Sequence, residues 1–202
     1  MDKIRLILET IGTIAFAVSG ASVGIDHKMD LFGVCALGMT TAVGGGIVRD
    51  IILGIVPPMA FEDPFYVLLS IAVSFLLFII RKKLDLDKFG DSTAMLVCDT
   101  VGLAVFTIVG IASAFRISDN SFMAVFVGVV TGVGGGVMRD IAAQQMPYIF
   151  RKHVYATASL AGAILCVAMW QVNQLAASIA GSGAIVALRL LAAHFRWSLP
   201  KA

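Results

Sequence analysis

Charged side chains are scarce in this sequence, and their scarcity excludes an ordinary soluble domain. Only 14% of the 202 residues are Asp, Glu, Lys or Arg, whereas 59% are hydrophobic. A soluble domain usually carries about 25% charged residues. The net charge of +2 is small and gives no indication of nucleic-acid binding.

Cysteine and histidine are rare as well, with three of each. Cys35, Cys98 and Cys166 all fall in apolar stretches, so we expect small core residues rather than disulfides or metal ligands. The histidines show no ligand spacing. The sequence also has no Ser-His-Asp set, nucleotide-binding loop or paired catalytic carboxylates. We therefore expect no enzyme, no cofactor and no resident metal ion.

Apolar stretches of about 20 residues dominate the chain, and this length crosses a bilayer as a helix. The first stretch follows two basic residues and resembles a signal peptide, but Glu9 interrupts it and it has a counterpart later in the chain. We predict an all-α membrane protein with one membrane domain and seven transmembrane helices, roughly at residues 4–25, 32–56, 65–81, 96–115, 121–145, 153–171 and 176–195.

One segment occurs twice: GGGIVRD at 44–50 returns 90 positions later as GGGVMRD at 134–140. The same shift places Pro57 on Pro147 and several glycines on glycines. Such repetition indicates a duplicated structural unit. We predict two three-helix repeats and a seventh helix, at residues 4–84, 94–172 and 176–195. Because three is odd, the second repeat must cross the membrane in the opposite direction, which makes an inverted-topology repeat.

Lysine and arginine are concentrated in the loops on one side of the predicted membrane. Positively charged loops normally face the cytoplasm. We therefore expect a multi-pass protein of the cell (inner) membrane, with the N-terminus outside and the C-terminus in the cytoplasm.

The glycine triplets weaken the second and fifth predicted helices, because glycine costs about 1 kcal/mol per residue in a helix interior. We predict that both helices are kinked or broken there, so that freed carbonyl groups attract cations. Close packing between small residues is the alternative. The threonines before the triplets can offer hydroxyls to an ion, although such hydroxyls often bond their own backbone. The predicted kink and pore residues are Gly44, Gly45, Gly46, Gly134, Gly135, Gly136, Thr41 and Thr131.

An Arg-Asp pair follows each triplet, and each charge costs about 3 kcal/mol at mid-membrane unless it is compensated. Neighbours on a helix point about 100° apart, so we expect Arg49 not to fold onto Asp50. Glu9 and Arg49 lie at similar depth, roughly 9 and 7 Å from the membrane centre, which predicts an ion pair between them. Asp50 is then left to face the lumen or to cap a half-helix; locking helices together is the alternative role of these charges. The second copy predicts the equivalent set Asp99, Arg139 and Asp140, with Asp99 paired to Arg139.

The doubled Gly-Gly-Gly-x-x-Arg-Asp motif, in two three-span units plus a seventh span, resembles the prokaryotic trimeric intracellular cation (TRIC) channels, which are also classed as a glycine transporter domain family. The resemblance covers about residues 5–195. It implies a homotrimer among membrane lipids, with a pore in each protomer that passes monovalent cations such as potassium and sodium between helices 2 and 5. The motif charges would lie beside that pore. The alternative is a secondary transporter of a small amino acid such as glycine, which inverted repeats with broken helices also suit.

Overall fold

The computed structural model describes residues 2–84, 93–151, 154–195 and 197. This part of the chain is all-helical, as the sequence predicts, and it contains nine helices and no strand. In chain order the helices are α1 (Asp2–Asp26), α2 (Leu31–Ile52), α3 (Met59–Glu62), α4 (Phe65–Leu84), α5 (Thr93–Phe115), α6 (Ser121–Ala142), α7 (Tyr148–Arg151), α8 (Ala156–Met169) and α9 (Gln174–His194).

Six of these helices, α1, α2, α4, α5, α6 and α9, are long and apolar enough to cross a membrane. The sixth predicted span, at 153–171, corresponds to α8, whose 14 residues are fewer than a full span needs. Two four-residue helices, α3 and α7, follow the ends of α2 and α6. The sequence pattern did not predict these short helices, because they lie in the loops between apolar stretches.

Helix boundaries follow local capping chemistry at equivalent places in the two units. Asp30 and Asn120, 90 positions apart, cap α2 and α6 by accepting a backbone N–H three residues on. Gly54 and Gln144 follow the other ends of these helices with φ of 72° and 55°. A left-handed residue is the usual way to end a helix. Gln144 therefore keeps the backbone conformation of Gly54 without being a glycine.

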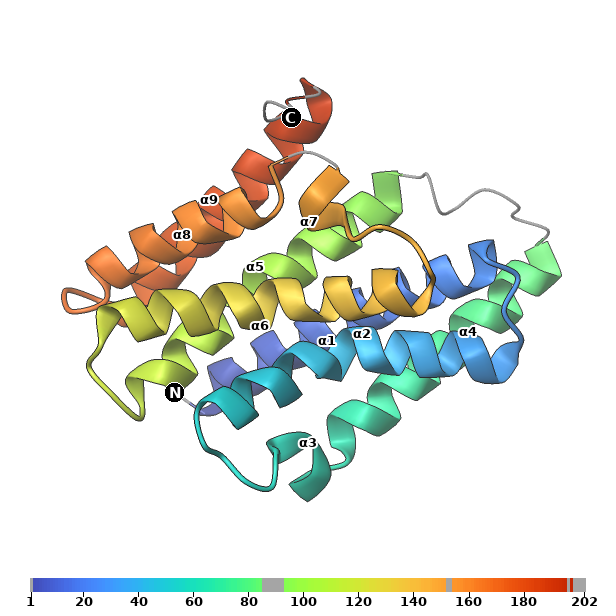
Figure 1. The fold of residues 1–202 in the computed structure, drawn as a ribbon, viewed down its shortest axis with the longest axis horizontal. Coiled ribbons are helices and arrows are strands. Elements are labelled where there is room, and N and C mark those ends of the chain that lie inside the picture. Colours follow the sequence, from blue (N-terminus) through green and yellow to red (C-terminus); the bar gives the residue numbers. More distant parts are fainter. Residues whose placement is uncertain (1, 85–92, 152–153, 196, 198–202) are drawn as a thin grey trace.

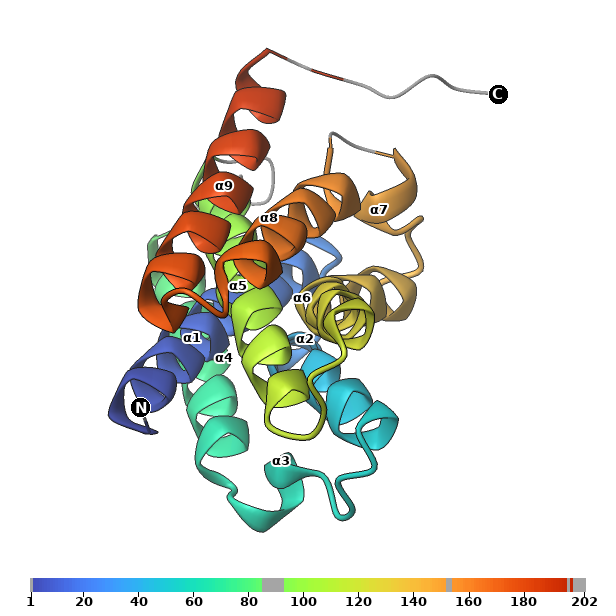
Figure 2. The same cartoon turned by 90° about the vertical axis from the view of Figure 1, so that its left-hand side faces the viewer.

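The long helices pack around a central pair. α2 contacts α6, α1 packs on α2, α5 packs on α6, and α1 also contacts α5 (Figure 1). α4 covers one side of this core against α1 and α2, while α8 and α9 cover the other side against α5 and α6 (Figure 2). The glycine-containing helices therefore cross in the middle of the molecule.

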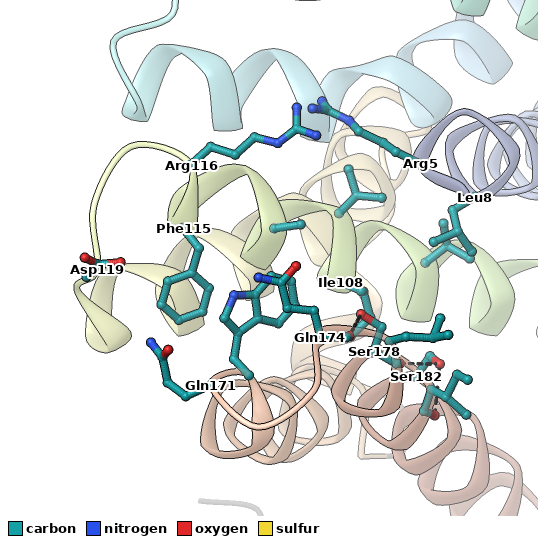
Figure 3. Close-up of a pocket in the computed structure, with 16 residues that line it drawn as sticks. Arg5, Leu8, Ile108, Phe115, Arg116, Asp119, Gln171, Gln174, Ser178 and Ser182 are labelled. Carbon is teal, nitrogen blue, oxygen red and sulfur yellow. Dashed lines mark hydrogen bonds between the residues drawn. The ribbon is translucent and has the colours of Figure 1, made fainter. Parts of the chain in front are cut away.

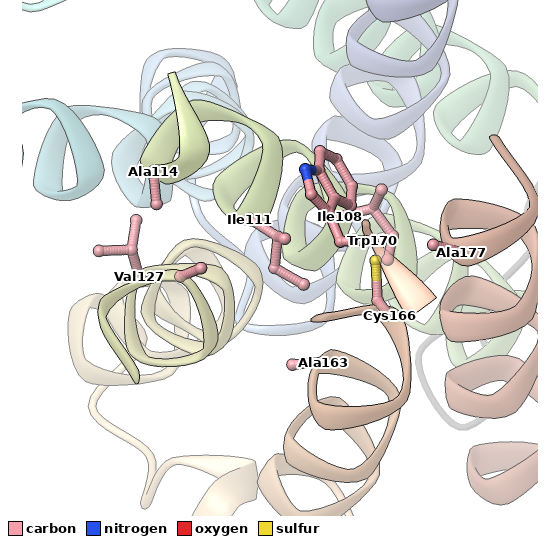
Figure 4. Close-up of a cluster of buried hydrophobic side chains, with 9 residues drawn as sticks. Ile108, Ile111, Ala114, Val127, Ala163, Cys166, Trp170 and Ala177 are labelled. Atoms are coloured by element: carbon pink, nitrogen blue, oxygen red, sulfur yellow. The ribbon is translucent and has the colours of Figure 1, made fainter. Parts of the chain in front are cut away.

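A buried apolar cluster fills the space where α5, α6, α8 and α9 meet (Figure 4). Ile108 and Ile111 of α5, Val127 of α6 and Cys166 of α8 are all buried in it. The burial of Cys166 agrees with its prediction as a small core residue. This packing attaches α9, the helix outside the two predicted repeats, to the second of them.

Candidate functional site: the glycine crossing and its two charge clusters

α2 and α6 cross with their glycine triplets in contact. A Cβ atom placed on Gly45 would fall on the carbonyl oxygen of Thr131, and one on Gly135 would fall on the carbonyl oxygen of Thr41. A Cβ on Gly134 would lie 3.3 Å from the Cα of Gly45. The two backbones thus approach each other without side chains between them, which only glycine allows.

Both helices continue through their triplets without a break. α2 is helical from Leu31 to Ile52 and α6 from Ser121 to Ala142. The predicted break is therefore wrong, a kink at the triplets stays a prediction, and close packing of small residues describes this structure. The reason is that helix propensity measures an intrinsic cost of about 1 kcal/mol per glycine, and the contact between the two helices offsets it.

The outer glycines of each triplet are less confined than the central ones. A Cβ on Gly44 would meet the Met138 sulfur at 2.5 Å, and one on Gly136 would meet the Tyr155 hydroxyl at 2.9 Å. On Gly46 it would find only an Arg49 nitrogen, at 3.9 Å. Each triplet thus has a central position that the crossing requires to be glycine. Of the outer positions, Gly44 and Gly136 face side chains, whereas Gly134 faces the Cα of Gly45.

Thr41 and Thr131 lie at the crossing, but their hydroxyls do not face an open path. Each is buried and donates at 2.6 Å to a carbonyl four residues back, that of Leu37 or Val127. The prediction that these hydroxyls are offered to an ion is not what this structure shows; they bond their own helix. Their carbonyl oxygens are the groups that reach the partner helix.

Beyond the α2 triplet lies a group that we call the first charge cluster: Arg5, Glu9, Arg49, Asp50 and Tyr66. The Nε of Arg49 donates to Asp50 at 2.8 Å, and its Nη1 lies 4.0 Å from Glu9. Glu9 also accepts from the Nε of Arg5 at 2.9 Å and from the Tyr66 hydroxyl at 2.8 Å. Glu9 thus joins α1, α2 and α4.

The second charge cluster lies beyond the α6 triplet and contains Asp99, Arg139, Asp140, Tyr155 and Arg189. The Nε of Arg139 donates to Asp140 at 2.8 Å, and its Nη1 donates to Asp99 at 2.7 Å. The other oxygen of Asp99 accepts from the Nη2 of Arg189 at 3.0 Å. The Arg189 guanidinium also lies over the Tyr155 ring, 4.5 Å from its centroid.

The structure corrects the expected roles of the motif aspartates. Asp50 and Asp140 pair with the arginines that precede them and are at most 1% exposed, so neither faces a lumen. One arginine can donate hydrogen bonds to the neighbouring aspartate and to a distant acid at the same time, because its guanidinium carries five N–H donors. The second oxygen of each aspartate accepts the first backbone N–H of the following short helix, at Met59 or Tyr148, at 2.9 and 2.8 Å. They cap α3 and α7 rather than half-helices.

Four members of the two clusters were not predicted from the sequence: Arg5, Tyr66, Tyr155 and Arg189. Arg189 could have been identified, because it is an isolated cation inside an apolar 21-residue helix. The two tyrosines could not have been identified, since each lies at the start of a helix, where the sequence pattern does not determine the packing. Within the described ranges, no group of three His, Cys, Asp or Glu residues could hold a metal ion.

Two cavities lie near these groups. One of about 50 Å³ adjoins the first charge cluster and is lined by Glu9, Gly46, Arg49 and Tyr66, among others; it is large enough for water. The second, of about 420 Å³, lies between α1, α5 and α9, with Arg5 and Arg116 at one side and serines of α9 at the other (Figure 3). The larger cavity contains none of the residues predicted for the site.

Comparison with known proteins finds a matching family and relatives that are similar over most of this chain. A family model described as Glycine transporter matches residues 6–82 and 96–171. The UPF0126 inner membrane protein YadS of Escherichia coli K12 is 37% identical over 194 residues, which covers 95% of this chain and 92% of YadS. The UPF0126 membrane protein YvgT of Bacillus subtilis is 32% identical over 197 residues, which covers 96% of this chain and 94% of YvgT.

Solved structures are similar over nearly the whole chain. A TRIC trimeric intracellular cation channel orthologue from Rhodobacter sphaeroides superimposes with a TM-score of 0.89 at 31% identity, covering 96% of this chain and 99% of that one. A chain from a structural study of conductance through TRIC cation channels gives 0.86 at 33% identity, covering 97% and 96%.

Proposed function

The chain belongs to the glycine transporter family, whose structural neighbours here are TRIC channels, and we propose that it is a channel for monovalent cations, potassium among them. The pathway we propose runs inside each protomer between α2 and α6. The observation that carries the proposal is the crossing of these helices, where glycine backbones meet and a charge cluster follows each triplet. Similarity to TRIC cation channels supports the assignment.

We propose that residues 4–84 and 94–172 form two repeats of opposite orientation, with α9 as a seventh helix outside them. Equivalent contacts 90 positions apart support this arrangement. Arg49 and Arg139 both donate to the following aspartate at 2.8 Å. An inverted repeat places one cluster toward each membrane face and the glycine crossing between them.

Carbonyl oxygens and carboxylates are the groups that would attract a cation along this path. The carbonyls of Thr41 and Thr131 lie at the crossing, and Glu9 and Asp99 lie in the clusters on either side. The crossing is closed here, since the glycine backbones touch. Because the triplets weaken both helices, we expect α2 and α6 to bend there when the path opens.

We propose a homotrimer in the inner membrane with the N-terminus outside. The relatives named as inner membrane proteins and the apolar spans support a multi-pass inner membrane protein. The solved neighbours are named as trimeric channels. Phe32 and Phe122, at equivalent places in α2 and α6, are 82% and 79% exposed and are suited to contact with lipid.

Recording from the purified protein in planar bilayers tests the proposal. Discrete unitary currents carried by potassium are expected, and they exclude a carrier that must change conformation for every substrate molecule. The family description favours one alternative, a secondary transporter of glycine. Saturable glycine uptake into proteoliposomes without unitary currents would establish that alternative instead.

A further inference from the structure

Arg189 is a buried cation that comes from outside both predicted repeats. It lies on α9, it is 1% exposed, and it donates to Asp99 of α5 at 3.0 Å. Asp99 accepts from Arg139 of α6 with its other oxygen at 2.7 Å. One carboxylate therefore joins α5, α6 and α9, and Tyr155 under the Arg189 guanidinium adds the start of α8.

The first charge cluster has a different construction. Its second arginine, Arg5, lies one turn from Glu9 on the same helix, and its side chain is 17% exposed. Arg49 lies 4.0 Å from Glu9 rather than at hydrogen-bond distance, and Glu9 lines the cavity of about 50 Å³. Glu9 also accepts hydrogen bonds with both oxygens, but it borders this cavity and its side chain is 11% exposed, so a cation can reach it from one side.

The second charge cluster presents donors rather than acceptors. Both oxygens of Asp99 are occupied by guanidinium groups. Four buried donor atoms of the cluster have no hydrogen-bond partner within the part of the chain that is described: Arg139 Nη2, Arg189 Nε and Nη1, and the Tyr155 hydroxyl. A cation arriving here meets a cluster whose two acids, Asp99 and Asp140, are already paired with its two arginines, so no unpaired carboxylate attracts it.

We propose that Arg189 determines cation passage at the second charge cluster: by occupying Asp99 and resting on Tyr155, it keeps this end of the pathway closed until α9 moves. The inference rests on the proposed channel function. In this proposal α9, the helix outside the repeats, makes the two ends of the pathway different. A cation would pass when Arg189 leaves Asp99 and one carboxylate oxygen becomes free.

Potassium flux from proteoliposomes tests this inference with the variant Arg189→Gln. At an effective dielectric constant of about 20, a unit positive charge lowers the concentration of a cation roughly 10 Å away by about tenfold, so flux should rise by about that factor when the charge is removed. Arg81→Gln is the matched control, because Arg81 is also buried and also bound to an acid, Asp26 at 2.8 Å, but belongs to neither cluster. Its flux should equal that of the unchanged protein.

An Arg189→Gln protein that assembles normally by size-exclusion chromatography, yet conducts within twofold of the unchanged protein, overturns the inference and leaves the channel function standing. An equal rise in Arg81→Gln overturns it too. Where Arg189→Gln does not assemble, Arg189→Lys decides, because it keeps the charge but loses the stacking of the guanidinium on Tyr155. Flux above the unchanged level then supports the inference, and unchanged flux refutes it. No potassium flux in any of the proteins refutes the channel function and this inference with it.

Discussion

Replacing Gly45 with alanine should force α2 and α6 apart. The added Cβ would fall on the carbonyl oxygen of Thr131 and lie 3.3 Å from the backbone nitrogen of Gly135. These are backbone atoms of a packed helix, so no side chain can rotate away to make room. An overpacked contact of this kind costs about 3 kcal/mol, and the better helix propensity of alanine returns about 1 kcal/mol. We expect a net loss of about 2 kcal/mol.

The neighbouring position provides a control within the same triplet. A Cβ on Gly46 would find only an Arg49 nitrogen, at 3.9 Å. Gly46→Ala should therefore keep the propensity gain and raise stability by about 1 kcal/mol. For a chain of this length 1 kcal/mol corresponds to about 2–4 °C in Tm. Gly45→Ala and Gly46→Ala should thus differ by about 6–12 °C, in opposite directions from the unchanged protein.

Thermal unfolding of the purified protein in one detergent, followed by its two tryptophans, measures this difference. Equal Tm values for the two variants would refute the reasoning, because they would show that the crossing does not need glycine at this position. A stability loss in Gly46→Ala as large as in Gly45→Ala would point instead to an intrinsic need for flexibility in the triplet.

Three further predictions, two of them with a control variant, test other contacts by the same thermal measurement. Asp140→Asn should lower stability by about 3 kcal/mol, because it removes the acid that pairs with the buried Arg139. The control Asp119→Asn, at an exposed position, should change stability by less than about 0.5 kcal/mol. Similar losses in the two variants would show that the Arg139–Asp140 pair does not stabilise the fold. Tyr66→Phe removes a hydrogen bond to a carboxylate and should cost about 1 kcal/mol, but Tyr155→Phe should cost almost nothing, since that hydroxyl has no partner in the described residues. Gly183→Ala adds a Cβ with nothing within 4 Å and should raise stability by up to about 1 kcal/mol; a loss would reveal a contact on this helix face.

Sequence comparison within the chain was sufficient for the features that the two copies share. The two triplets contact each other at Gly45 and Gly135, where close packing was the alternative to a break, and the predicted partners of Arg49 and Arg139 lie 4.0 and 2.7 Å away. Depth along a helix can be counted from a sequence at a known rise per residue, and this count paired Glu9 and Asp99 with the arginines that lie beside them in the structure. The capped helix starts and left-handed helix ends also recur 90 positions apart.

Features that depend on tertiary packing could not be predicted in this way. The triplets suggested a broken helix because propensity counts only the intrinsic cost of glycine, whereas the contact at Gly135 needs a regular helix on both sides. The contact of Arg49 with Asp50 was excluded from the direction of the Cα–Cβ bonds, but a long side chain can curl back around the helix surface.

Charge balance explains why each cluster needs a residue that the repeat does not provide. The duplicated unit supplies two acids and one arginine to each cluster, which would leave a buried negative charge in the membrane and a cost of about 3 kcal/mol on insertion. The first cluster is neutralised by Arg5, whose position in the second copy is held by buried Met95. The second cluster is neutralised by Arg189 of α9 instead. Since the two clusters are neutralised from different helices, a repeated sequence motif gives the proposed pathway two unequal ends, which need not open under the same conditions.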